Sequence, residues 1–189
     1  RSNPLLLAEF TLSRKEPLYG NGAKEIQKAE TERMAGGNPC KVIPGLKDVM
    51  GVVKDTFADA DHTNTGFGST IFAVKPGDGS AREQAASCQK VLGGWANIAN
   101  EYATKRYRSN LINWGMLPFL IKDGDLPFQN LDYLFIPGIK KAVEEKADII
   151  KSYVVSKEGL QEFELRLGEL TDEERQIILK GCLINYNRV

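Results

Sequence analysis

Ser80 and Arg82 stand together in the stretch VKPGDGSAREQAA, directly after two glycines and ahead of a helical pattern. At the beginning of a helix, unpaired backbone N–H groups and the positive end of the helix dipole favour negative charge. The same donors would stabilise a deprotonated Ser80 hydroxyl, which could then act as a base, and the planar Arg82 guanidinium suits a carboxylate. Gly77 and Gly79 would let a substrate approach the backbone. The stretch therefore predicts a site for an anionic substrate.

A purely structural role explains the same residues. Ser80-Ala81-Arg82-Glu83 fits the S-x-x-E capping box, in which Ser80 accepts from the Glu83 amide and Glu83 reaches back to the Ser80 amide. Capping boxes are common, so the local pattern alone favours a helix cap, with the glycines serving only the turn. A phosphate-binding P-loop is not expected, because no Gly-Lys-Ser/Thr follows.

Helices and strands alternate around this turn. The segment that ends in it is rich in strand formers, and Thr171 and Glu174 predict a second capping box near the end of the chain. The pattern indicates an α/β domain, since helices alternate with strands and paired strands come late. Helices are expected in residues 20–37, 44–57, 81–92, 106–115, 139–147 and 170–187, strands in 69–76, 116–121, 132–138, 148–156 and 160–167, and either in 93–103.

The composition excludes several classes of partner. The chain has 189 residues with 25 basic and 25 acidic side chains, so it offers no electrostatic case for nucleic acid or an anionic membrane. No run is long and apolar enough to span a bilayer. Cys40, Cys88 and Cys182 lie far apart in the sequence and lack the spacing of metal ligands, and His62 is the single histidine, so we expect no metal site in this chain. An odd number of widely spaced cysteines also argues against a disulfide framework and favours a reducing, cytoplasmic setting.

Two segments carry a resemblance to a known family. GDGSAREQAA followed by YRSNLINWGMLP closely resembles the paired signatures of the aconitase-family C-terminal domain, G-x-G-S-S-R-E and then (R/E)-(S/T)-N-L…G-x-L-P. The ending LTDEERQIILKGCLINYNR also looks like the terminus of aconitase-like hydratases. The resemblance covers residues from about Ser69 onward. It implies that residues 1–189 form a single swivelling β/β/α domain, of which residues 1–60 are a less typical, partly helical portion.

The resemblance also implies a function. Members of this family are hydro-lyases that dehydrate and rehydrate di- or tricarboxylic hydroxy acids, with a 4Fe-4S cluster held by three other domains and none bound by this one. The implied site residues are Ser80 as the base, Arg82, Ala81 and Gly79 at the substrate, and Arg108, Ser109 and Asn110 as support. Ala81 replaces the second serine of the family motif, which removes a hydroxyl donor and favours a divergent branch.

The expected partners follow from the same resemblance. They are a carboxylic-acid substrate and the remaining cluster-binding domains of the same polypeptide, because the chain opens without methionine and suggests a fragment of a longer protein. By itself the domain should be inactive. Two alternatives stay open: a non-catalytic binding or regulatory relative, and a separate small subunit of an enzyme similar to the isopropylmalate isomerases.

Overall fold

The first part of the fold is helical. The structure, a computed structural model, describes Ala8 and residues 17–188. The first elements are α2 (Pro17–Met34), the short 3-10 helix η1 (Pro39–Lys41) and α3 (Leu46–Thr56). Leu46, Met50 and Val53 are buried on one side of α3, as the three- and four-residue spacing of the apolar residues predicts. Helix α2 begins three residues earlier than the sequence predicts, at Pro17, because proline is well tolerated in the first turn of a helix.

A parallel unit follows. It consists of β1 (Ser69–Ala73), α4 (Arg82–Val91), β2 (Gly94–Ala99), α5 (Lys105–Asn113) and β3 (Leu117–Leu120). Strand β2 pairs in parallel with both β1 and β3. The segment 93–103, for which the sequence allows helix or strand, thus contains the strand β2. This strand lies in the middle of the parallel unit, and five of its six residues are buried. The turn that carries Ser80 leaves the carboxyl end of β1, where parallel sheets commonly bind ligands.

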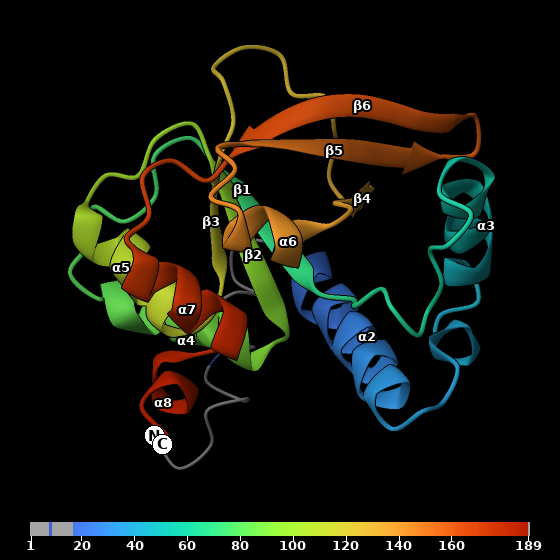
Figure 1. The fold of residues 1–189 in the computed structure, drawn as a ribbon, viewed down its shortest axis with the longest axis horizontal. Coiled ribbons are helices and arrows are strands. Elements are labelled where there is room, and N and C mark those ends of the chain that lie inside the picture. The colour runs from blue at the N-terminus through green and yellow to red at the C-terminus, as the bar shows by residue number, and fades with distance from the viewer. Residues whose placement is uncertain (1–7, 9–16, 189) are drawn as a thin grey trace.

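The remaining strands complete one mixed sheet. They belong to the series β4 (Tyr133–Phe135), α6 (Ile139–Glu144), β5 (Ile149–Ser156), β6 (Gly159–Arg166), α7 (Asp172–Lys180) and α8 (Leu183–Tyr186). The strand order is β1-β2-β3-β6-β5-β4, and the pairs beyond β3 are antiparallel. In Figure 1 the β5–β6 hairpin extends away from the parallel strands. The described residues therefore form the predicted α/β fold with a helical N-terminal portion.

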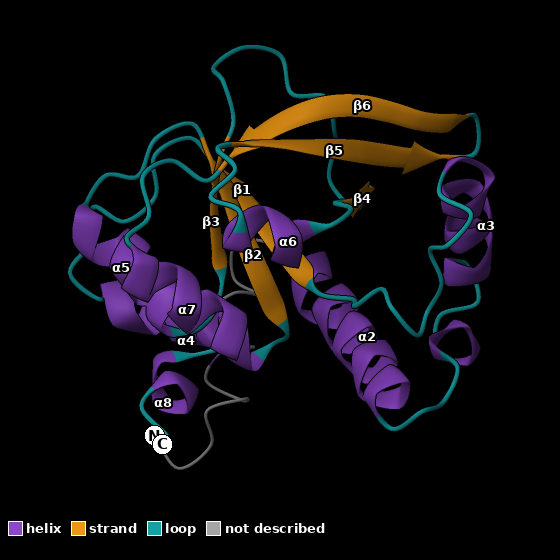
Figure 2. Cartoon of the chain, in the orientation of Figure 1, coloured by secondary structure: helices purple, strands orange, loops and turns teal. Residues whose placement is uncertain are grey.

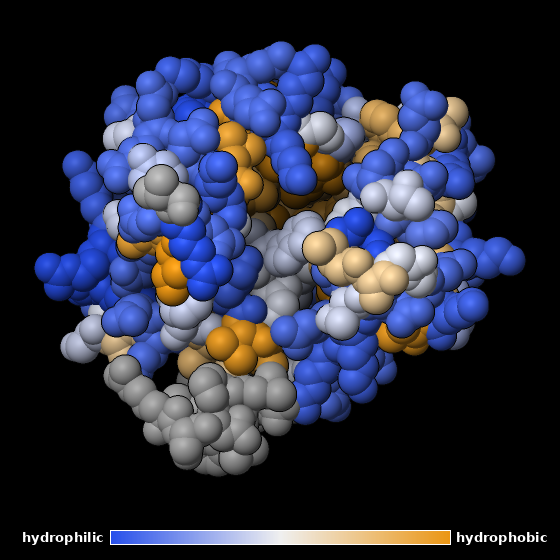
Figure 3. Space-filling model, turned by 60° about the horizontal axis from the view of Figure 1, so that its bottom comes forward, coloured by the Kyte–Doolittle hydropathy of each residue, from blue (hydrophilic) through white to orange (hydrophobic). Residues whose placement is uncertain are grey.

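The helices surround the parallel strands unevenly. Helices α4, α5 and α7 lie together beside β1–β3, whereas α2 contacts β1 and α3 packs on β5 and β6 (Figure 2). Figure 3 shows a hollow near the middle of one face of the molecule, with hydrophobic side chains along part of its rim. The helical N-terminal portion thus contacts the edge strand β1 through α2 and the β5–β6 hairpin through α3.

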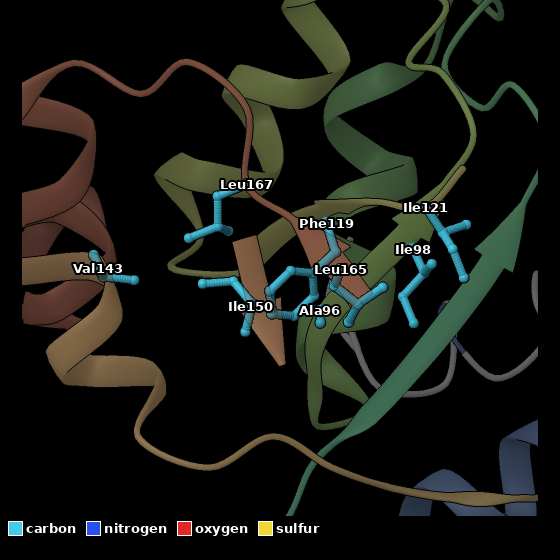
Figure 4. Close-up of a cluster of buried hydrophobic side chains, with 8 residues drawn as sticks. All are labelled: Ala96, Ile98, Phe119, Ile121, Val143, Ile150, Leu165 and Leu167. Atoms are coloured by element: carbon cyan, nitrogen blue, oxygen red, sulfur yellow. The ribbon is translucent and has the colours of Figure 1, made fainter. Parts of the chain in front are cut away.

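The main core joins the parallel and antiparallel strands. Phe119 of β3 and Leu165 of β6 are fully buried, and Val143 brings α6 to the same cluster (Figure 4). The other buried members are Ala96, Ile98, Ile121, Ile150 and Leu167. Complete burial of a side chain of this size stabilises the fold by about 1.5–3 kcal/mol. This core fixes the carboxyl ends of β1–β3, and hence the base from which the Ser80 turn departs.

Candidate functional site

Ser80 lies in the exposed turn between β1 and α4, but it does not cap the helix. Helix α4 begins at Arg82, and its N-cap residue is Ala81, with φ −90° and ψ 50° and no side-chain cap hydrogen bond. The predicted capping box between Ser80 and Glu83 is therefore wrong, because the helix begins one residue later than that motif requires. Ser80 is exposed, and its hydroxyl makes no hydrogen bond to any residue that the structure describes.

Arg82 organises the turn instead. Its Nε donates to the Gly77 carbonyl over 3.0 Å, and its Nη2 lies 3.5 Å from the Asp78 carbonyl oxygen. The side chain thus folds back over the loop that precedes its own helix and holds that loop in a defined shape. The N–H groups of Nη1 have no acceptor among the described residues. A carboxylate could bind at that end of the guanidinium.

The turn is also fastened to the beginning of α5. Thr104 caps that helix by accepting from the Tyr107 amide over 3.2 Å, and its hydroxyl donates to the Gly77 carbonyl over 3.0 Å. The Ala103 amide donates to the Pro76 carbonyl over 2.9 Å. Gly77 has a φ of +99°, and a Cβ at this position would overlap the Tyr107 side chain. The position therefore requires glycine for two reasons, its backbone conformation and the close approach of Tyr107.

Tyr107 belongs to a buried polar group beneath the turn. Its hydroxyl accepts from Gln89 Nε2 over 3.0 Å and from Asn97 Nδ2 over 2.8 Å. Burial raises the pKa of Tyr107, and the hydrogen bonds from Gln89 and Asn97 oppose that rise. The three side chains come from α5, α4 and β2, so they tie the two helices to the central parallel strand. Nothing local in the sequence distinguishes Thr104 or Tyr107 as parts of the site.

The second motif lies next to the first turn but reaches a different part of the chain. Arg108 donates through Nη2 to the Glu169 carbonyl over 2.5 Å and to the Leu167 carbonyl over 3.3 Å, so it ties α5 to the segment between β6 and α7. Ser109 and Asn110 are half-buried on α5, and their side chains make no hydrogen bond within the described part of the chain. Arg108 thus stabilises the packing of α5 rather than contacting the Ser80 turn.

Metal ligands do not converge anywhere in residues 17–188. No group of three or more His, Cys, Asp or Glu side chains there could hold a metal ion. Cys40, Cys88 and Cys182 are free thiols that lie in η1, in α4 and directly before α8. The described residues therefore do not fit an iron–sulfur cluster. None of the described helices is both long enough and apolar enough to cross a membrane.

Part of the chain is similar to known proteins. The model of the family described as aconitase C-terminal domain matches residues 49–124, a range that includes the Ser80 turn and α5. Aconitate hydratase A of Rickettsia bellii is 28% identical over 159 residues, which cover 78% of this chain and 18% of that protein. The chain thus spans about a fifth of the length of this curated relative.

A solved structure gives a further match. The crystal structure of 3-isopropylmalate dehydratase from Methanocaldococcus jannaschii aligns with a TM-score of 0.39 and 24% identity, covering 77% of this chain and 81% of that one. The family match begins 20 residues before Ser69 and ends at position 124, so it does not include the C-terminal ending that carries part of the predicted resemblance. The predicted resemblance is nevertheless confirmed over part of the chain: residues 49–124, which contain both ordered motifs, match the model of the aconitase C-terminal domain family.

Proposed function

We propose that this chain is the substrate-closing domain of an aconitase-like hydratase and that Ser80 removes a proton from a carbon atom of a hydroxy acid. The observation that carries the proposal is the state of the Ser80 hydroxyl, which is exposed and makes no hydrogen bond within the described chain, although the turn around it is firmly held. A hydroxyl needed only for the fold would be engaged in it. A relative named aconitate hydratase supports the reaction class.

The chemistry assigned to this chain is proton transfer and binding of negative charge. The deprotonated Ser80 oxygen takes the proton from the carbon atom and becomes a hydroxyl, while the electron pair of the broken C–H bond forms a C=C bond and the hydroxyl of the adjacent carbon leaves as water, protonated by a group outside this chain. Before this transfer, the first turn of α4 favours the negative charge on the Ser80 oxygen because its backbone N–H groups have no intrahelical acceptors. Ala81 supplies no side-chain acceptor for those groups. The position of Gly79 directly before Ser80 leaves room beside the turn, since nothing lies within 4 Å of a Cβ built there.

Arg82 binds a substrate carboxylate in this proposal. Because Nε is held by the Gly77 carbonyl, the guanidinium is positioned before the substrate arrives, and the carboxylate meets Nη1. Pre-positioning of this kind reduces the conformational entropy lost on binding. Arg108, Ser109 and Asn110 support the site indirectly, since Arg108 fixes α5 and α5 holds the loop through Thr104.

The iron–sulfur cluster of this family would belong to domains outside the chain. The described residues offer no ligand set for it, so no step assigned to this chain runs through it. The proposal accordingly requires that other domains bring the rest of the site to Ser80, and a closing movement of the swivelling type would do so.

Turnover by the longer polypeptide tests the proposal. The wild type, Ser80→Ala and Ser87→Ala would be compared after anaerobic reconstitution of the cluster, on a panel of hydroxylated and unsaturated di- and tricarboxylates. Loss of a general base lowers kcat by roughly 10²–10⁴-fold, so Ser80→Ala should fall by at least that lower factor. Ser87 lies on α4, and its hydroxyl donates to the Gln84 carbonyl and makes no other hydrogen bond within the described chain, so its alanine variant should retain turnover.

Each outcome has a distinct meaning. Undiminished turnover in Ser80→Ala contradicts the role of Ser80 as the base. Absence of turnover in the cluster-loaded wild type on every acid of the panel contradicts the enzymatic proposal and favours a non-catalytic binding relative.

A further inference from the structure

A pocket of about 330 Å³ lies at the other end of α4 from Ser80. It opens where β2 begins and where the chain approaches β1, whereas Ser80 follows the carboxyl end of β1. Helix α4 has 10 residues and so separates the two places by about 15 Å along its axis. The side chains that line the pocket include Gln27, Glu30, Met34, Phe67, Lys90 and Trp95.

Trp95 forms a fixed aromatic wall of this pocket. A Cβ on Gly66 or on Gly68 would overlap the indole, so the ring lies directly against the backbone of residues 66–68. The remaining surface of Trp95 is open, and the residue is 39% exposed. The indole N–H has no acceptor among the described residues. Trp95 therefore offers an apolar surface and one free hydrogen-bond donor.

Helix α2 also lines the pocket, and its polar side chains there already make hydrogen bonds. Gln27 Nε2 donates to the Val91 carbonyl over 2.9 Å. Glu30 accepts from the Phe67 amide over 2.9 Å and from Arg33 over 2.8 and 2.7 Å. The negative charge of Glu30 is thus balanced within the protein. The bonds of Gln27 and Glu30 also hold α2 against the end of α4 and against the loop before β1.

Of the two charged side chains that line the pocket, Glu30 and Lys90, only Lys90 has no ion pair among the described residues. It lies in the last turn of α4 and is half-buried, and no carboxylate of the described residues lies within 4.0 Å of its ammonium group. Burial lowers the pKa of Lys90, an effect that nearby Cys182 opposes. A partly desolvated cation beside an apolar wall favours an anionic group with an apolar body.

We propose that this pocket binds a small aromatic carboxylate, with its ring against Trp95 and Phe67 and its carboxylate on Lys90. The volume is at the lower end of the range for small-molecule sites and suits a single-ring acid. Aromatic stacking and a charge-assisted hydrogen bond supply the two kinds of recognition that such pockets combine. The site does not depend on the proposed hydratase function, because none of its residues belongs to the Ser80 turn.

Titration of the 189-residue chain with three probes tests the proposal. Phenylacetate, phenylacetamide and phenethylammonium have the same ring and differ in charge. The indole N–H resonance of Trp95, assigned with Trp114→Phe, reports binding by NMR. Phenylacetate should shift it saturably, with a Kd at least about tenfold lower than that of phenylacetamide, which corresponds to about 1.4 kcal/mol. Phenethylammonium should bind more weakly than either.

Variants of the lysine separate its charge from its packing. Lys90→Met should bring the acid and the amide to the same Kd, and Lys90→Arg should keep the preference for the acid. Lys47→Met, which removes an exposed lysine on α3, is the control and should behave as the wild type. Equal binding of acid and amide by the wild type, a retained preference in Lys90→Met, or the absence of saturable shifts with any probe would each overturn the proposal.

Discussion

The chain has two S/T-x-x-E segments, and replacing the first residue of each by alanine tests whether its hydroxyl stabilises the fold. Thr171 accepts from the Glu174 amide over 3.1 Å, and Glu174 Oε2 accepts from the Thr171 amide over 2.9 Å, so this S/T-x-x-E segment is a complete capping box. Ser80 opens the other such segment and caps nothing. Thr171→Ala should lower the free energy of unfolding by about 1 kcal/mol, with an upper limit near 2 kcal/mol. Ser80→Ala should change it by less than about 0.5 kcal/mol.

Urea unfolding of the 189-residue chain, followed by circular dichroism, measures both changes. The slope m should be the same in all three proteins, so that the midpoints compare directly. In thermal unfolding, a loss of 1 kcal/mol corresponds to a decrease in Tm of about 2–4 °C at this size. If Ser80→Ala is destabilised as much as Thr171→Ala, the Ser80 hydroxyl is engaged in the fold, and the reasoning that assigns it to chemistry is refuted.

Three further changes test other parts of the fold. Gly77→Ala should destabilise the chain by about 1–3 kcal/mol, because the backbone has a positive φ and the new methyl group would overlap Tyr107; wild-type stability in urea would contradict this. Phe119→Ala should cost about 3–5 kcal/mol by calorimetry, since the ring is fully buried, and a cost below 1 kcal/mol would speak against the core described here. Lys146 Nζ lies 2.6 Å from Asp172 Oδ1 and lowers the pKa of that carboxyl group, so Asp172→Asn should be less stable than the wild type at neutral pH. In thermal unfolding, this difference in stability should vanish as the pH falls below about 3.9, the ordinary pKa of an aspartate. A difference that does not depend on pH would exclude the ion pair as its cause.

Local patterns in the sequence predict most of the secondary structure. The spacing of Leu46, Met50 and Val53 and the capping box at Thr171 each depend on residues within one or two helical turns, and both are confirmed. The start of α4 is predicted less well. The sequence predicts a helix from residue 81 with Ser80 as its cap, whereas the helix begins at Arg82 and Ala81 is its N-cap. Boundaries and faces of short helices depend on tertiary contacts that periodicity does not include.

The contacts that build the two candidate sites are distant in sequence. Gly77 meets Tyr107 across 30 positions, and Gly68 meets Trp95 across 27. A motif therefore identifies Ser80 and Arg82, yet it gives no sign that Thr104 holds their loop or that Trp95 and Lys90 line one pocket. Those relations arise because parallel strands bring the loops at each end of β1 and β2 together.

Ala81 stands at the position of the second serine in the family motif, and its place in the structure explains what this substitution does. As a substitution for serine it removes a hydroxyl donor, and on sequence alone it favours a divergent branch of the family. In the structure Ala81 is the N-cap, the position from which a serine side chain would accept from an amide of the first turn. With alanine there and Ser80 outside the helix, the first-turn amides have no side-chain acceptor and remain available to an anion beside Ser80. The same substitution that removes a hydroxyl from the motif therefore leaves backbone donors of α4 without a side-chain acceptor, which supports the proposal that the Ser80 turn binds negative charge.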